Sequence, residues 1–86
     1  MIDTEQFRVW LKKNSGYSDA VISDTISRVK RADSILEWDA DELYQFHLEH
    51  IDAYKKLTVC VRSQIKKAVS LYRSFHLDSL GTDNDV

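Results

Sequence analysis

Six apolar residues recur at helical spacing near the end of the chain, and they constrain the fold more than any other feature. They keep one face of an expected helix, from Thr58 to about Phe75, apolar over roughly four turns. The chain lacks proline and has only two glycines, so little interrupts such a helix. The sequence therefore predicts an all-α protein whose longest helix packs through Val61, Ile65, Ala68, Val69, Tyr72 and Phe75.

Three earlier segments have the start signals and periodicity of amphipathic helices. The first covers residues 4–14 after a capping Asp3, and the second starts after Ser18. The third starts after Asp39, which pairs with Glu42 as in a capping box. Together the four segments predict a compact four-helix bundle with this core: Trp10, Ile22, Ile26, Val29, Leu43, Phe46, Val61, Ile65, Val69 and Tyr72.

The length of 86 residues fits a single domain. We expect residues 1–77 to form the helical domain. Residues 78–86 (DSLGTDNDV) have no periodicity and carry three aspartates, so we expect a disordered acidic tail. Cys60, the only cysteine, excludes an intramolecular disulfide; its apolar neighbours predict that it fills core space.

The compartment is predicted from what the sequence lacks. Asp3 and Glu5 occupy the positions where a secretory signal peptide needs basic residues. No apolar run approaches the roughly 18 residues of a membrane span. A lone cysteine is typical of a reducing compartment. We therefore expect a soluble cytoplasmic protein with no membrane partner.

Charge is sorted along the chain. The segment from Glu37 to Asp52 has six acidic residues and no basic one, and we call it the acidic segment. The segment from Ala53 to Leu77 has six basic residues and no acidic one, and we call it the basic segment. Blocks of this kind create a directional field, which affects the choice of partner more than the net charge does.

Two interpretations of the basic segment remain open. Arg62, Lys66 and Arg73 lie at i, i+4 and i+11, along one side of the apolar stripe. Such a row can follow a phosphate backbone and release its counterions. Alternatively, the third helix packs beside the last one, and the acidic and basic segments neutralise each other.

Motifs for catalysis, metals and cofactors are not evident. His47 and His50 stand at i and i+3, but no third ligand is apparent, so we predict no metal site. The two glycines are too far apart for a phosphate-binding loop. We expect no cofactor, no small-molecule substrate and no enzymatic activity.

Two stretches of the sequence resemble one protein family. The stretch "FRVWLKKNSGYSDAVISDTISRVKRADSIL" places F-x-x-W-L before G-Y-S, and "LTVCVRSQIKKAVSLYRSF" is similar to the last helix of the same domain. Both resemble the N-terminal core-binding domain of phage-integrase-type tyrosine recombinases, over residues 4–77. The resemblance implies a SAM-like helical bundle that clamps DNA, without the family's separate catalytic domain.

The resemblance implies binding to duplex DNA in site-specific recombination or integration, with a recombinase or host protein as a further partner. It places DNA contacts on the second and the last helix, and two lysines of the basic segment complete the candidate set. These candidates are Arg28, Lys30, Arg31, Lys55, Lys56, Arg62, Lys66, Lys67 and Arg73.

The alternative is a small helical protein–protein interaction module of phage or mobile-element origin. Such a module would bind a host protein, and its acidic segment could mimic nucleic acid.

Overall fold

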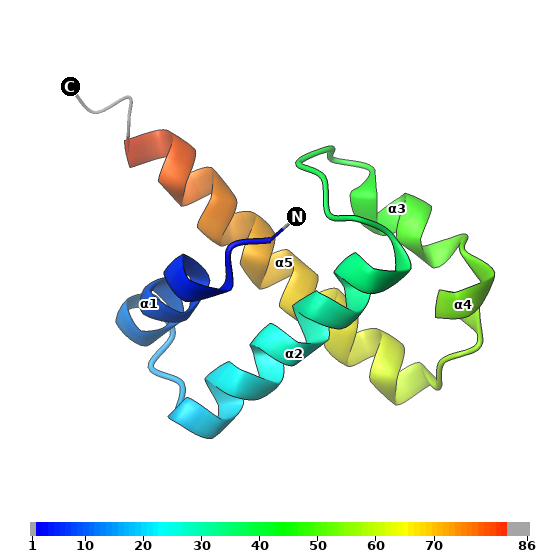
Figure 1. Cartoon of the computed structure of the whole chain (residues 1–86), viewed down its shortest axis with the longest axis horizontal. Helices are drawn as coiled ribbons and strands as arrows, with labels where there is room; N and C mark the ends of the chain where they lie inside the picture. The colour runs from blue at the N-terminus through cyan, green and yellow to red at the C-terminus, as the bar shows by residue number, and fades with distance from the viewer. Residues whose placement is uncertain (1, 83–86) are drawn as a thin grey trace.

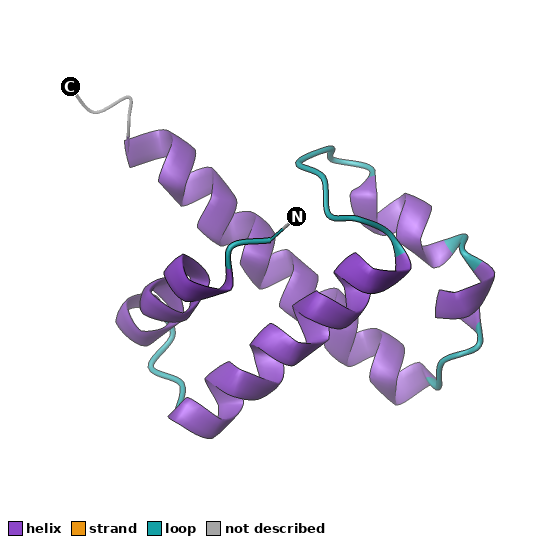
Figure 2. Ribbon diagram, viewed as in Figure 1, coloured by secondary structure: helices purple, strands orange, loops and turns teal. Residues whose placement is uncertain are grey.

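The computed structural model describes residues 2–82, and the side chains of residues 2–79. Every regular element in this part is a helix, which confirms the all-α prediction (Figures 1 and 2). There are five helices in residues 2–82, one more than predicted, because two short helices occupy the region of the expected third one. The helices are α1 (Thr4–Asn14), α2 (Asp19–Ile35), α3 (Tyr44–Glu49), α4 (Asp52–Lys55) and α5 (Val59–Thr82).

The starts of α1, α2 and α5 confirm the predicted boundaries. At each start a side chain accepts a hydrogen bond from an amide that has no partner within the helix. The pairs are Asp3 with Gln6 at 3.1 Å, Ser18 with Val21 at 3.4 Å, and Thr58 with Val61 at 3.3 Å. Between α1 and α2, Gly16 has a φ of 68°, which glycine adopts at little cost.

The crossing of α2 and α5 forms the centre of the molecule (Figure 1). The first buried cluster, which we call the α1 core, lies where α1 joins the crossing, and the second, the α3 core, lies where α3 and α4 join it. Trp38 packs against both. The α1 core comprises Phe7, Leu11, Ile22, Ile26, Val29, Ala68, Tyr72 and Phe75; the α3 core comprises Ala32, Tyr44, Leu48, Tyr54, Ile65 and Val69.

Most of the predicted core residues are buried, but two on the third helix are not. Leu43 and Phe46 are 54% and 55% exposed, while Tyr44 and Leu48 are buried. The error comes from the helix start: α3 begins at Tyr44, and Asp41 holds the preceding turn by accepting a hydrogen bond from the Leu43 amide at 2.9 Å. The predicted capping box of Asp39 and Glu42 is therefore wrong. Trp10 and Val61 are partly buried.

The last helix is longer than predicted. It continues past Phe75 to Thr82, and the Trp10 Nε1–H donates a hydrogen bond to Asp78 Oδ2 at 2.9 Å. The expected helix end at Phe75 is wrong, and residue 78 contacts α1 although we expected it to belong to a disordered tail. Residues 83–86 of the predicted tail lie outside the described residues.

Cys60 is exposed, which corrects its predicted place in the core. It lies five residues before Ile65 on α5, so the two side chains point about 140° apart. Within residues 2–82, none of the helices combines the length and the apolar character that a membrane span requires.

Candidate nucleic-acid interface

The side of α5 that carries Arg62, Lys66 and Arg73 faces α3 and α4. The three positions lie within about 40° of one another around the helix axis. Lys66 and Arg73 line a hollow of about 210 Å³ together with Asp39 and Asp41. Arg62 and Lys66 line an open groove of about 590 Å³ next to it. The spacing thus predicted a common side correctly, but this side meets the acidic segment.

Two of these three cations contact the acidic segment. Lys66 Nζ lies 4.0 Å from Glu49 Oε2, and Arg73 Nη1 donates a hydrogen bond to the Glu42 carbonyl at 3.2 Å. Arg62 is half-buried. Of the two interpretations of the basic segment, these contacts favour the one in which the third helix packs beside the last one. The Lys66 and Glu49 side chains are 66% and 42% exposed, so their ion pair contributes only about 0–1 kcal/mol.

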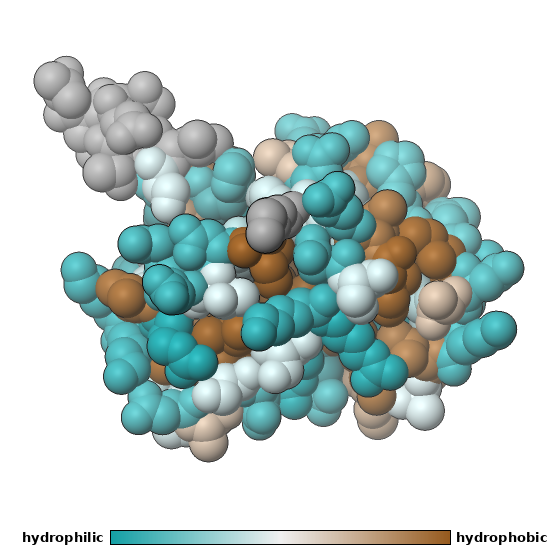
Figure 3. Space-filling view, viewed as in Figure 1, coloured by the Kyte–Doolittle hydropathy of each residue, from teal (hydrophilic) through white to brown (hydrophobic). Residues whose placement is uncertain are grey.

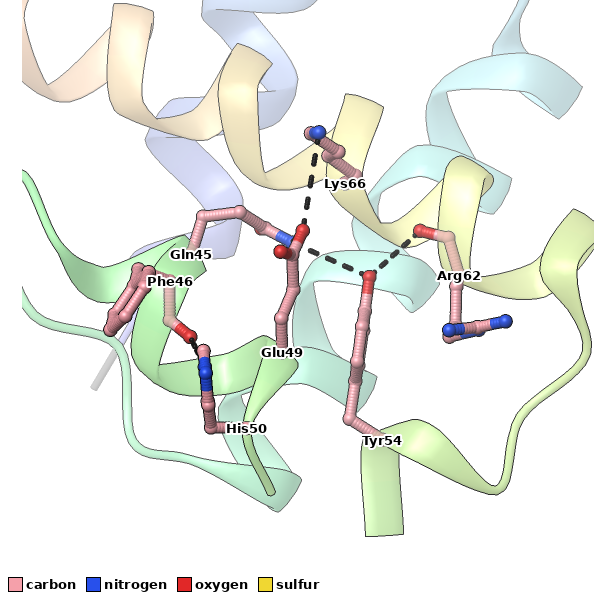
Figure 4. Close-up of polar contacts among 7 residues, drawn as sticks. All are labelled: Gln45, Phe46, Glu49, His50, Tyr54, Arg62 and Lys66. Atoms are coloured by element: carbon pink, nitrogen blue, oxygen red, sulfur yellow. Dashed lines mark hydrogen bonds and ion pairs between the residues drawn. The ribbon is translucent and has the colours of Figure 1, made fainter. Parts of the chain in front are cut away.

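Tyr54 connects α4 to this side of α5 (Figure 4). Its hydroxyl donates to the Arg62 carbonyl at 2.9 Å and accepts from Gln45 Nε2 at 3.4 Å. The same Gln45 nitrogen donates to Glu49 Oε2 at 3.0 Å. Sequence analysis missed Tyr54 and Gln45. The one signal in the sequence was that Tyr54 is a lone aromatic residue in a charged stretch.

A second basic surface lies on another side of α5, where it meets α2. Arg28 of α2 and Lys67 of α5 line the same hollow of about 210 Å³, together with Gln64. Arg28 is half-buried and Lys67 is exposed. Neither side chain forms an ion pair within the part of the chain that the structure describes. The other residues around the hollow are Tyr17, Val21, Thr25, Ala68 and Leu71.

The three hollows differ in their acidic residues. Asp39 and Asp41 line the first and Glu49 lines the groove. The residues around the hollow between α2 and α5 include two cations and no carboxylate. Neighbouring carboxylates lower the local positive potential, so this last hollow keeps the field of its cations best.

The remaining candidates are more scattered. Lys30 and Arg31 are exposed on α2, and Arg31 follows Arg28 by three residues, which puts the two on neighbouring positions of the helix. Lys55 lines the groove beside α4, and Lys56 is exposed just after that helix. The nine predicted residues are therefore spread over α2, α4, α5 and the residue after α4, and they do not form one continuous site.

Two buried tyrosines have raised pKa values. Burial, with a smaller effect of the Asp33 charge, raises the pKa of Tyr44 from 10 to about 12. Burial also raises the pKa of Tyr72. Both hydroxyls stay protonated at neutral pH and have structural partners: Tyr44 donates to the Leu36 carbonyl at 2.6 Å, and Tyr72 accepts from the Asp3 amide at 2.9 Å.

The histidines of α3 are placed away from any group of metal ligands. His50 Nδ1 lies 2.7 Å from the Phe46 carbonyl, and its ring packs against the Phe46 ring at an interplanar angle of 40°, with centroids 4.4 Å apart (Figure 4). In the described part of the chain, no three side chains of His, Cys, Asp or Glu gather closely enough to hold a metal ion.

Comparisons of the chain with protein-family models, with curated proteins and with solved structures give no match. The resemblance to recombinase core-binding domains therefore stays a prediction, and functional inference depends on the geometry of the basic surfaces.

Proposed function

We propose that the protein binds the phosphate backbone of duplex DNA through one surface, formed by Arg28, Arg31, Gln64 and Lys67, which we call the α2/α5 face. A single observation carries this proposal. Arg28 and Lys67 come from different helices, line one hollow without a carboxylate, and have no ion-pair partner among the described residues.

The release of counterions from DNA supplies the affinity in this proposal. Each phosphate neutralised by a cation releases condensed counterions, so two to three cations give weak, strongly salt-dependent binding. Cations on two crossing helices reach phosphates that one helix alone would not span. Gln64 adds an amide that can donate to a phosphate oxygen, and such contacts position the protein without reading sequence. Site-specific recombination or integration is the context that the family resemblance implies.

The row of Arg62, Lys66 and Arg73 has a smaller part in this proposal than its spacing predicts. Two of its members already contact Glu49 and the Glu42 carbonyl, and a phosphate would have to compete with these groups. The proposal therefore shifts the main DNA contact from one side of α5 to the other.

The test is fluorescence anisotropy with a labelled duplex of about 20 base pairs, at about 50 and 200 mM salt. The double variant Arg28→Glu/Lys67→Glu should lose binding at both salt concentrations. The matched control Arg8→Glu/Lys13→Glu reverses two exposed cations outside the hollow and makes the same change in net charge. The control should bind within a few-fold of wild type; equal losses in both variants would refute a defined face.

A second candidate function is protein binding, and the exposed pair Leu43 and Phe46 favours it. Both side chains are more than half exposed, lie three residues apart and belong to the acidic segment. Exposed apolar side chains rimmed by charge are common at protein interfaces. Cross-linking in a host extract followed by binding of the purified partner would test this. Wild type should bind it and Leu43→Ser/Phe46→Ser should not; equal binding would contradict this candidate.

A further inference from the structure

The open groove between α4 and the start of α5 has more cationic side chains than its contact with the acidic segment can neutralise. Lys55 enters it from α4, and Arg62 and Lys66 enter it from α5. Glu49 is the one carboxylate among the residues that line it. The groove therefore has two more cationic than anionic side chains.

Glu49 compensates these cations poorly. Its Oε2 accepts a hydrogen bond from Gln45 at 3.0 Å, whereas Lys66 Nζ stays 4.0 Å away (Figure 4). Lys55 and Arg62 make no ion pair within the described part of the chain. Glu49 Oε2 is thus shared between Gln45 and Lys66, and the charges of Lys55 and Arg62 are left available to a ligand.

Arg62 also has an unused donor. Its Nε is shielded from solvent and has no hydrogen-bond partner among the described residues. A buried N–H without an acceptor is unfavourable and rare in folded proteins. The guanidinium group of Arg62 also carries two terminal nitrogens, and such nitrogens can donate to two oxygens of one phosphate. The exposed Ser63 lines the same groove and offers a hydroxyl donor.

The position of the groove adds to this charge. Val59, Arg62 and Ser63 belong to the first turns of α5, a helix of 24 residues, and all three line the groove. The N-terminal end of a long helix carries a partial positive charge from its unpaired amides. An anion in the groove would interact with this end as well as with the three side chains.

We propose that this groove binds a phosphate dianion, held by Arg62 and Lys55 with Lys66 and Ser63 at its edge. The excess of two cations matches a dianion, whereas a phosphodiester of the DNA backbone has one negative charge. The ligand's source is either free phosphate or the terminal phosphate of a DNA strand. The site is separate from the α2/α5 face, and the proposal does not rest on the proposed function.

The test is a titration of the full chain with inorganic phosphate, followed through backbone amide chemical shifts. We expect saturable shifts at Lys55, Arg62 and Ser63, with sodium chloride at equal ionic strength producing none of them. A linear response without saturation up to about 50 mM, or equal shifts with chloride, would overturn the proposal.

Two variants and two oligonucleotides complete the test. Lys55→Gln changes an exposed residue, and Arg62→Gln removes the guanidinium; each should weaken phosphate binding at least tenfold, while Lys67→Gln should leave it unchanged. If Arg62→Gln does not fold, Lys55→Gln alone decides, and unchanged binding contradicts the proposal. A 5′-phosphorylated duplex that shifts Ser63 more than its 5′-hydroxyl counterpart identifies DNA ends as the source, and equal shifts identify free phosphate.

Discussion

The two ends of the molecule are held together in different ways. In the α1 core, rings from α1 and α5 meet directly: Phe7 contacts Tyr72 and Phe75 with ring centroids 5.0 and 5.5 Å apart. Around the α3 core, side chains bond to backbone groups: Tyr44 donates to the Leu36 carbonyl at 2.6 Å and Tyr54 to that of Arg62 at 2.9 Å. Contacts between aromatic rings thus join the long helices at one end, and tyrosine hydroxyls bonded to backbone carbonyls join the elements at the other.

The difference follows from helix length. The six-residue α3 and the four-residue α4 are too short to be stable by themselves, so tertiary contacts must hold them. Figure 3 shows apolar surface gathered where the C-terminal end of α2 meets the α3 end of the molecule. The α3 end is also where the acidic segment lies against α5. The acidic segment therefore contacts Lys66 and Arg73 at this end, while Arg28 and Lys67 of the α2/α5 face have no such contact among the described residues.

The largest expected effect is on stability at the α1 end. Phe7 is 1% exposed, so Phe7→Ala should lower the free energy of unfolding by about 3–5 kcal/mol. Leu48→Ala in the α3 core should cost about 2–5 kcal/mol. Urea denaturation measures both. Hydrogen exchange should then show Leu48→Ala exposing amides of α3 and α4 while those of α1 stay protected. An equal loss of protection at the amides of α1, α3 and α4 would contradict the distinction between the two ends.

The next effect is a loss of stability at high pH. The folded protein holds the Tyr44 proton with a pKa of about 12, against an ordinary value of 10. The unfolded chain releases this proton first, so the stabilisation is complete below pH 10 and is lost as pH rises toward 12. Its size is about 2–3 kcal/mol, and the raised pKa of Tyr72 acts in the same direction.

Tyr44→Phe should reduce the slope of unfolding free energy against pH between pH 10 and 12. An unchanged slope would show that Tyr44 is not buried as described.

A smaller effect concerns the end of α5. Asp78→Ala removes the acceptor of the Trp10 indole, which should cost about 0.5–1.5 kcal/mol and lower the thermal midpoint by several degrees. Asp24→Ala, an exposed change of the same charge on α2, is the control and should leave the midpoint nearly unchanged. Equal midpoints for the two variants would argue that residue 78 lies outside the folded domain.

The smallest effect is expected at the two exposed residues of the α3 end. Leu43→Ser/Phe46→Ser should change the free energy of unfolding by less than about 0.5 kcal/mol per residue, because both side chains are already largely in water. Thermal denaturation checks this. A loss of several kcal/mol would show that these residues belong to the core, as the sequence predicts.

The difference between the two ends also explains which helices could be predicted from the sequence. Periodicity and caps predicted α1, α2 and the start of α5, because each long amphipathic helix carries its own signal in apolar spacing. The register of α3 was missed because Tyr44 is fixed by a hydrogen bond to Leu36, a partner eight residues away that leaves no periodic trace. The extension of α5 past Phe75 was missed because the Trp10–Asp78 contact joins residues 68 positions apart.

The candidate site was predictable to a similar degree. Helix spacing placed Arg62, Lys66 and Arg73 on one side, and the family resemblance added Arg28 and Lys67 as candidates. Spacing on one helix could not show which cations meet the acidic segment, because that depends on how α3 packs against α5. Nor could it show that two cations from different helices line one hollow.

The most direct test of the central claim compares two double variants on duplex DNA by anisotropy at about 50 mM salt. Arg28→Glu/Lys67→Glu changes the α2/α5 face, and Lys66→Glu/Arg73→Glu changes the side that meets the acidic segment. If the α2/α5 face carries the contact, the first variant loses binding while the second keeps most of it, with both folded by circular dichroism. The reverse order, or wild-type binding by the first variant, would contradict the assignment of DNA binding to the α2/α5 face.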